Sequence, residues 1–245
     1  MNDTIKCPSL FLESTKLFSC LPKILLERLG NRTHWQYIHK GGCFDVQPNK
    51  VYVVSSGHIM IFRETFNGSI FINSIEGADG VYGTIYFEQR ILEPAKIQAL
   101  NNTLLWTVNL NGLIDILVQH KEFVRRLLDI QAKQQKVASA EMEGLALKST
   151  EQRLGCYLLR LWLKAKKKET VRLPIEKKTI ANKLGMTLET LSRSLKSLSA
   201  HKLITIENYD FKVLDEFKLI SLSCSSCSRS FPCKDLVAID TGLEA

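Results

Sequence analysis

A predicted helix that begins near residue 188 carries polar side chains of the types that contact nucleic acid. Leu191, Leu195 and Leu198 form an apolar stripe on one face of this helix, so the polar side chains occupy the opposite face. Thr187 stands where a side chain that caps the helix belongs. The polar residues are Glu189, Thr190, Ser192, Arg193 and Lys196.

A second predicted helix precedes this one and turns the pair into a helix-turn-helix. In the preceding segment Ile180, Ala181 and Leu184 recur at helical spacing, and Gly185 follows where a helix ends. A helix-turn-helix packs the apolar side of its second helix inward and offers the polar side to the major groove of DNA. The stretch 175–202 therefore predicts a DNA-binding element.

The charge of the chain is concentrated around the same stretch. The whole chain has a net charge of +8, while residues 148–202 hold 14 Lys and Arg against 4 Asp and Glu, which is a net +10. A basic excess confined to one segment is typical of a nucleic-acid footprint. A solvated basic helix face is the alternative interpretation, and its coincidence with the helix-turn-helix favours DNA.

Three of the seven cysteines lie within ten residues near the C-terminus. Cys224 and Cys227 are three residues apart, a spacing at which two thiolates can bind one metal, and Cys233 adds a third ligand. One coordination position would remain for another group. An iron–sulfur cluster, a zinc site, a thiol–disulfide switch and a tail with incidental cysteines all stay open.

Residues 33–110 have the pattern of an antiparallel barrel or jelly roll. Short runs rich in β-branched and aromatic residues alternate there with turn signals, and Asn67-Gly68 between two apolar runs predicts a hairpin. The segment before them, 8–30, is expected to be helical. The predicted strands are 51–54, 58–62, 69–72, 95–100 and 104–110.

A long helix is predicted over 113–148, where no proline occurs and the periodicity is helical. A helix this long with a polar seam favours an interface between two identical chains, and a helix lying across its own barrel is the alternative. Two neighbouring rows share the 3,4 spacing. They are Leu127, Ile130, Gln134, Val137, Glu141 and Gly144, and next to them Leu128, Gln131, Gln135, Ala138, Met142 and Leu145.

The whole pattern predicts an α+β chain in four parts. These are a β-barrel sensor-type domain at 1–112, a dimerisation helix at 113–148, a winged helix-turn-helix at 149–220 and a Cys-rich tail at 221–245. The wing is expected at 203–214, as two strands joined by a turn.

Several classes of protein are disfavoured by the sequence. We find no nucleophile–base set, Gly-rich phosphate loop or paired carboxylates, so we do not expect an enzyme. No run of 18 apolar residues and no basic segment leading into an apolar one occur, which predicts a cytoplasmic protein without a membrane span.

This order of elements, together with the amino-acid sequence of residues 175–206, resembles that of the CRP/FNR family of bacterial transcription regulators. The recognition helix of that family reads DNA with a Glu and an Arg four positions apart, and the FNR branch adds a Ser before the Arg. Glu189, Arg193 and Ser192 match them. A carboxylate accepts from cytosine N4, and a guanidinium donates to guanine O6 and N7. The resemblance implies a homodimer on inverted-repeat DNA with TTGAT-like half-sites, and contact with RNA polymerase.

Other polar residues of the helix are expected to contact the DNA backbone. Thr187, Thr190 and Lys196 are predicted phosphate contacts, which set the register of the protein on DNA without reading its sequence. The alternative for Glu189 and Arg193 is a surface ion pair worth a few tenths of a kcal/mol.

The barrel departs from the cyclic-nucleotide pattern of the family. Gly83 is kept, but Thr84 replaces the acid that holds the ribose, and Glu93-Pro94 replaces the arginine region that holds the phosphate. A glutamate repels a phosphate, and Lys96 lacks the two-pronged geometry of a guanidinium. We therefore predict no cyclic-nucleotide binding.

The resemblance also suggests what the chain senses. Some FNR-like regulators from bacilli carry a C-terminal cysteine triad that, with a carboxylate from the dimer helix, holds a [4Fe–4S] cluster sensitive to oxygen, nitric oxide or redox state. The carboxylate position aligns near Gly144, so Glu143 or Glu141 is the candidate fourth ligand. The alternatives are a zinc or thiol–disulfide site, a haem in the barrel, and a tail that contacts a protein partner and senses nothing. The barrel region holds His34, His39 and His58.

Overall fold

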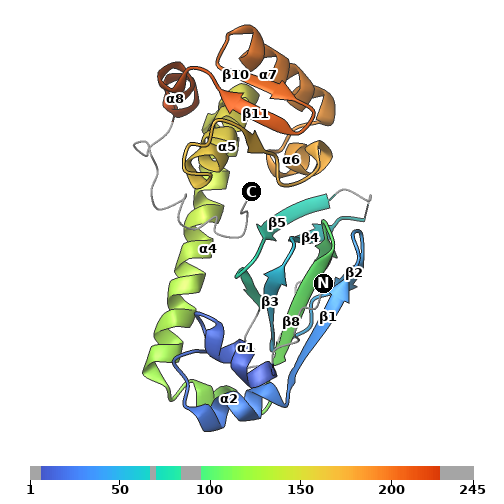
Figure 1. Cartoon of the computed structure of the whole chain (residues 1–245), viewed down its shortest axis with the longest axis vertical. Helices are drawn as coiled ribbons and strands as arrows, with labels where there is room; N and C mark the ends of the chain where they lie inside the picture. The colour runs from blue at the N-terminus through green and yellow to red at the C-terminus, as the bar shows by residue number, and fades with distance from the viewer. Residues whose placement is uncertain (1–6, 67–69, 84–94, 227–245) are drawn as a thin grey trace. The chain divides into compact units, whose positions relative to one another are not determined.

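The computed structural model describes residues 7–66, 70–83 and 95–226 (Figure 1). They form two compact units, the first comprising residues up to 63 with 74–133, and the second comprising 64–73 with residues from 134 onward. The predicted hairpin turn at Asn67-Gly68 lies outside the described residues; the two strands that precede and follow it in the chain are neighbours in one sheet.

The N-terminal region forms two short helices, α1 (Pro8–Ser14) and α2 (Lys23–Gly30), so the expectation that 8–30 is helical is wrong only for residues 15–22. The chain leaves the helix at Thr15, which is extended and whose hydroxyl donates to the Leu12 carbonyl at 2.7 Å. Pro22 then precedes α2 with φ −58°, and its fixed φ and missing N–H suit the start of a helix.

Two four-stranded antiparallel sheets follow, which confirms the predicted barrel or jelly-roll architecture. One has the order β1-β8-β3-β6 and the other β2-β7-β4-β5. In chain order the strands are β1 (Thr33–Ile38), β2 (Cys43–Asp45), β3 (Lys50–Ser56), β4 (Ile59–Glu64), β5 (Ile70–Glu76), β6 (Val81–Gly83), β7 (Lys96–Ala99) and β8 (Thr103–Asn109).

Side chains from both sheets form one buried cluster inside the barrel. Tyr52 is 2% exposed, its hydroxyl accepts from the Gln47 N–H at 3.0 Å, and burial raises the pKa of its phenol. Ile61 and Ile97 from the other sheet are fully buried in the same cluster. Close packing accounts for a glycine at position 83, because a Cβ there would lie 2.6 Å from the Lys50 carbonyl oxygen.

The predicted helix over 113–148 is divided into α3 (Ile114–Leu117) and α4 (Lys121–Leu147), so its first part is wrong. The side chains of Leu113, Leu117 and Phe123 are all buried in one cluster, together with side chains of α1 and α2. A straight helix would point Phe123 about 120° away from Leu117, because each residue turns about 100°. The break at 118–120 lets both side chains reach that cluster.

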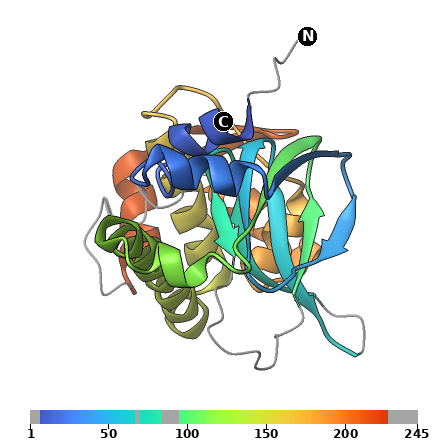
Figure 2. The same ribbon diagram turned by 90° about the horizontal axis from the view of Figure 1, so that it is seen from below.

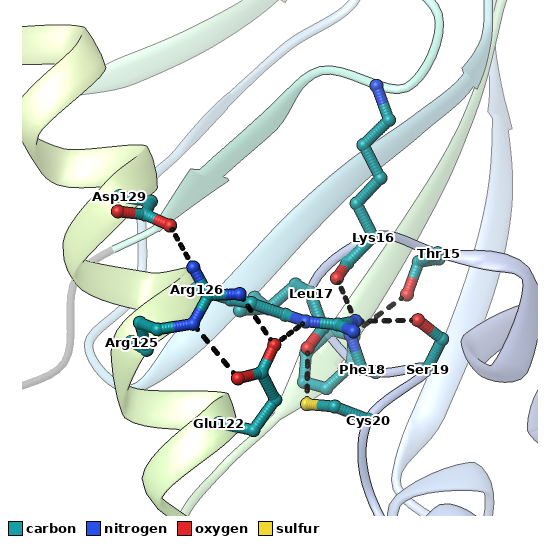
Figure 3. A network of polar contacts seen from close by, with 10 residues as sticks. All are labelled: Thr15, Lys16, Leu17, Phe18, Ser19, Cys20, Glu122, Arg125, Arg126 and Asp129. Atoms are coloured by element: carbon teal, nitrogen blue, oxygen red, sulfur yellow. Dashed lines mark hydrogen bonds and ion pairs between the residues drawn. The ribbon is translucent and has the colours of Figure 1, made fainter.

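The start of α4 is fixed to the turn between α1 and α2 by polar contacts (Figure 3). Arg126 donates to the Lys16 carbonyl at 2.6 Å and to the Ser19 hydroxyl at 2.7 Å. Hydrogen bonds from Arg125 and Arg126 hold the pKa of Glu122 near 2. Figure 2 shows α1 and α2, in blue, beside the green start of α4.

The two predicted rows of α4 differ in exposure along the whole helix. Every member of the row that begins at Leu127 is partly or fully buried. Every member of the row that begins at Leu128 is exposed, with Leu128 at 62% and Met142 at 64%. We call this exposed row, Leu128, Gln131, Gln135, Ala138, Met142 and Leu145, the α4 seam.

The second unit contains a winged helix-turn-helix, as predicted. Its strands form an antiparallel sheet in the order β10-β11-β9. Ser149 caps α5 with a reciprocal pair of hydrogen bonds to Gln152, which is a capping box. The elements are α5 (Thr150–Lys164), β9 (Val171–Arg172), α6 (Lys177–Lys183), α7 (Leu188–Ala200), β10 (Ile204–Glu207), β11 (Asp210–Val213) and α8 (Glu216–Cys224).

Candidate nucleic-acid interface

Helix α7 is held in place by its apolar stripe and its cap. Leu191, Leu195 and Leu198 are between 0% and 6% exposed, as the sequence predicted. The Thr187 hydroxyl accepts from the Thr190 N–H at 3.1 Å, which satisfies one of the free donors at the start of the helix. Figure 1 shows α7 beside the hairpin of β10 and β11.

The turn between α6 and α7 requires a glycine. Gly185 has φ +62°, and a Cβ there would lie 2.6 Å from Leu145 Cδ2. Arg153 of α5 reaches the same turn, donating to the Lys148 carbonyl at 3.0 Å and to the Gly185 carbonyl at 3.4 Å. The end of α4, the start of α5 and the turn of the helix-turn-helix are therefore joined.

The opposite face of α7 is open to solvent. Thr187, Glu189, Ser192, Arg193 and Lys196 are exposed, and Thr190 is half-buried. Within the described part of the chain no ion pair joins Glu189 to Arg193, so the alternative of a surface ion pair is not seen. Arg193 instead donates to the Thr190 hydroxyl at 3.2 Å. The face thus offers an anion, a cation and hydroxyls together.

An ion pair joins α4 to the first helix of the helix-turn-helix. Lys183 Nζ lies 2.7 Å from Glu141 Oε1, and their side chains are 9% and 24% exposed. Glu141, one of the two candidate metal ligands, is therefore already engaged by a cation. Glu143, the other candidate, also has a partner in the structure. Sequence reasoning missed this pair, because nothing local links residues 42 positions apart.

We expect Glu141→Gln to destabilise the protein, because it leaves a nearly buried ammonium without its counter-ion. The cost should be about 1–3 kcal/mol, and the double variant Glu141→Gln/Lys183→Met should recover much of it. Thermal unfolding followed by circular dichroism measures both. Glu216→Gln is the control, since its 2.7 Å pair with Lys167 is more exposed and should contribute under about 1 kcal/mol. Equal losses in Glu141→Gln and Glu216→Gln would contradict the assignment.

The wing carries an aromatic ring with two cations close to it. Arg172 lies 6.0 Å and Lys177 5.7 Å from the ring centroid of Tyr209, which is within cation–π range. Leu173 N–H donates to the Tyr209 carbonyl at 2.7 Å and fixes the wing against β9. The sequence predicts a wing at 203–214 but contains no signal for the two cations near Tyr209.

The C-terminal cysteines fall largely outside the described residues. Cys224 ends α8 and is half-buried, while Cys227 and Cys233 lie beyond the last described position. Gln152 donates to the Ser225 hydroxyl at 2.9 Å, and a Cβ on Gly155 would lie 2.2 Å from Ser223 Oγ. The segment that leads into the triad is thus packed against the start of α5. Residues 7–66, 70–83 and 95–226 contain no cluster of three or more His, Cys, Asp or Glu side chains that could hold a metal ion.

The barrel residues of the sequence analysis are spread over several elements. His34 and His39 are exposed, and the His58 ring nitrogen Nδ1 lies 3.1 Å from Asn101 Nδ2. Thr84, Glu93 and Pro94 lie outside the described residues. Lys96 on β7 has a partner in the structure. In the ranges that are described, no helix is both long and apolar enough to cross a membrane.

Comparisons of sequence and structure identify relatives of this chain. The model of the Crp-like helix-turn-helix domain matches residues 152–222. The transcriptional activator Anr of Pseudomonas protegens is 23% identical over 182 residues, which cover 73% of this chain and 74% of Anr. FnrA of Stutzerimonas stutzeri is 24% identical over 179 residues, covering 71% and 73%. The solved structure of FixK2 from Bradyrhizobium japonicum has a TM-score of 0.68 and 21% identity, covering 78% of this chain and 96% of FixK2.

Proposed function

We propose, because the chain belongs to the CRP/FNR family of transcription regulators, that it acts in the cytoplasm as a homodimer that binds inverted-repeat DNA sequence-specifically. The chain is a transcription regulator with a helix-turn-helix DNA-binding domain, and it is not an enzyme. We further propose that it contacts RNA polymerase, as an activator, at promoters that carry TTGAT-like half-sites.

The observation that carries this proposal is the exposed polar face of α7. Glu189 would accept from a cytosine N4, and Arg193 would donate to the O6 and N7 of a guanine. Ser192 is exposed on the same face, and its hydroxyl can donate to or accept from a base. Thr187 and Lys196 flank this set and would contact phosphates.

The homodimer rests on the α4 seam. Its 3,4 spacing is the heptad pattern of a two-stranded coiled coil, and its members are exposed from Leu128 to Leu145. Two parallel α4 helices related by a two-fold axis would carry two α7 helices to half-sites about 34 Å apart. Two copies would thus bury the apolar side chains that a single chain leaves in water.

Binding to synthetic duplexes tests the DNA proposal. We expect two chains on an inverted repeat of TTGAT-like half-sites, measured by fluorescence anisotropy with stoichiometric titration. A duplex with one scrambled half-site should bind at least about tenfold more weakly, because each wrong base pair costs about 1–3 kcal/mol. Equal affinity for both duplexes would contradict the proposal.

We propose that the signal is oxygen, nitric oxide or redox state, received at Cys224, Cys227 and Cys233. Thiolates are the ligands that iron–sulfur clusters and zinc prefer, and the packing of Ser223 and Ser225 against α5 ties the first cysteine to the DNA-binding unit. A [4Fe–4S] cluster there would supply reversible chemistry with oxygen or nitric oxide. Glu143 or Glu141 is the proposed fourth ligand; for Glu141, ligation would require release of Lys183.

Anaerobic purification tests the cluster. We expect brown protein with absorbance near about 400 nm that bleaches in air, with iron and sulfide in equal amounts. Cys227→Ser should lose the colour and the response of DNA binding to air while the chain stays folded. Cys156→Ser on α5 is the control and should keep both. Colourless protein with stoichiometric zinc would favour the structural zinc site, and absorbance typical of haem would favour the barrel.

A further inference from the structure

We infer that Thr190 is a positioning residue, which orients the guanidinium of Arg193 for base reading. This inference rests on the proposed function of α7 as the recognition helix. Arg193 Nη2 donates to Thr190 Oγ1 at 3.2 Å, and Thr190 Oγ1 lies 2.9 Å from Thr187 Oγ1. The three residues therefore form one continuous row of hydrogen bonds that starts at the helix cap.

The row follows from spacing and from the chemistry of a hydroxyl. Residues three apart are neighbours on a helix, so 187, 190 and 193 form one row inclined to the helix axis, in which each residue lies next to the following one. A hydroxyl has one hydrogen to donate and two lone pairs to accept with. In either orientation of the Thr187–Thr190 contact, the Thr190 oxygen accepts from the guanidinium. When Thr190 donates to Thr187, its only hydrogen is used, which polarises its oxygen and strengthens the bond from Arg193.

The anchoring of this row makes Thr190 more than a chance neighbour. The Thr187 hydroxyl also accepts from the Thr190 N–H at 3.1 Å, so the cap fixes Thr190 through both its backbone and its side chain. Thr190 is half-buried, whereas Arg193 and Glu189 are exposed. The hydroxyl of Thr190, which the cap holds in place, therefore contacts the long and otherwise mobile side chain of Arg193.

The consequence concerns the choice between two partners for Arg193. Glu189 is four residues before Arg193, the separation at which helical ion pairs form. Such a pair would withdraw both side chains from the bases that they are proposed to read. Thr190 binds Arg193 on the row of the cap instead, which leaves the carboxylate of Glu189 available. An arginine held near its binding geometry also loses less conformational freedom when DNA arrives. Thr190 thereby departs from our expectation of a simple phosphate contact.

The test is base discrimination, defined as the affinity for the inverted repeat divided by the affinity for a duplex whose Arg193-contacted guanine is replaced. Thr190→Val keeps the shape and removes the hydroxyl, and it should lower this ratio about three- to tenfold, the net value of one typical hydrogen bond. Affinity for random duplex should stay unchanged. Thr190→Ser should restore the ratio. Thr190→Val should have no further effect when Arg193 is already Ala.

The other outcomes overturn the inference in distinguishable ways. Equal loss on every duplex, persisting in the Arg193→Ala background, would make Thr190 a phosphate contact. An unchanged ratio in Thr190→Val, with a discriminating wild-type protein, would overturn the inference alone. A wild-type protein that does not discriminate would overturn it together with the proposed function. Thr107→Val on β8 controls for loss of a hydroxyl elsewhere, and circular dichroism checks that α7 stays folded.

Discussion

Leu128→Glu is expected to convert the dimer into a monomer and to abolish binding to inverted-repeat DNA. Both copies carry the change, so the interface loses two buried leucines and gains two facing carboxylates. With about 1.5–3 kcal/mol lost for each leucine, the dimer dissociation constant should rise by about two to four orders of magnitude. Sedimentation velocity measures the oligomeric state, and fluorescence anisotropy measures binding to the inverted repeat.

Leu147→Glu is the matched control for this experiment. Leu147 lies on the same helix and is 61% exposed in the single chain, against 62% for Leu128, but it falls outside the 3,4 row. The two substitutions should therefore have similar effects on a monomer and different effects on a dimer. If both variants stay dimeric, or both dissociate equally, the α4 seam is not the interface.

Arg193→Ala should weaken specific binding by about 1–3 kcal/mol, which is roughly a 5- to 150-fold loss of affinity. The reason is that alanine cannot donate to the O6 and N7 of a guanine. Base preference should relax at one position in each half-site and stay intact at the others. Anisotropy titrations against a set of duplexes, each with one base pair replaced, would measure this.

Lys196→Ala is the comparison for Arg193→Ala. A phosphate contact should lower the affinity for all duplexes by a similar factor and leave the base preference unchanged. If Arg193→Ala gives this uniform loss, the arginine contacts the backbone and the assignment of Glu189 and Ser192 to bases loses its support.

The local features of the DNA-binding unit could be predicted from the sequence, because each depends on residues close together in the chain. The leucine stripe of α7, the cap at Thr187 and the glycine at 185 are of this kind. The wing is a further example. The antiparallel sheets were predictable as a class, since alternating β-branched runs and turns specify strands.

Features that depend on contacts between distant segments could not be predicted. The break before α4 follows from burial of Leu117 and Phe123 in one cluster, and periodicity alone gave a continuous helix. Periodicity predicts two rows on α4 with the same spacing, and only their exposure in the structure separates them. The Glu141–Lys183 pair likewise joins residues 42 positions apart. The bond from Arg193 to Thr190 is local, but spacing allows Arg193 either Thr190 or Glu189 as a partner and does not decide between them.

The ion pairs of the second unit bear on how strongly ionic strength affects its association with DNA. Among the described residues of this unit, five basic side chains, Lys167, Arg172, Lys183, Lys212 and Lys218, have carboxylate partners within the same unit. Counterions are released only where a cation neutralises a phosphate, and each such contact adds about 0.9 to the slope of log affinity against log salt concentration. Lys183, almost enclosed beside Glu141, cannot take part. The slope for this protein should therefore be well below the value that its formal basic excess implies.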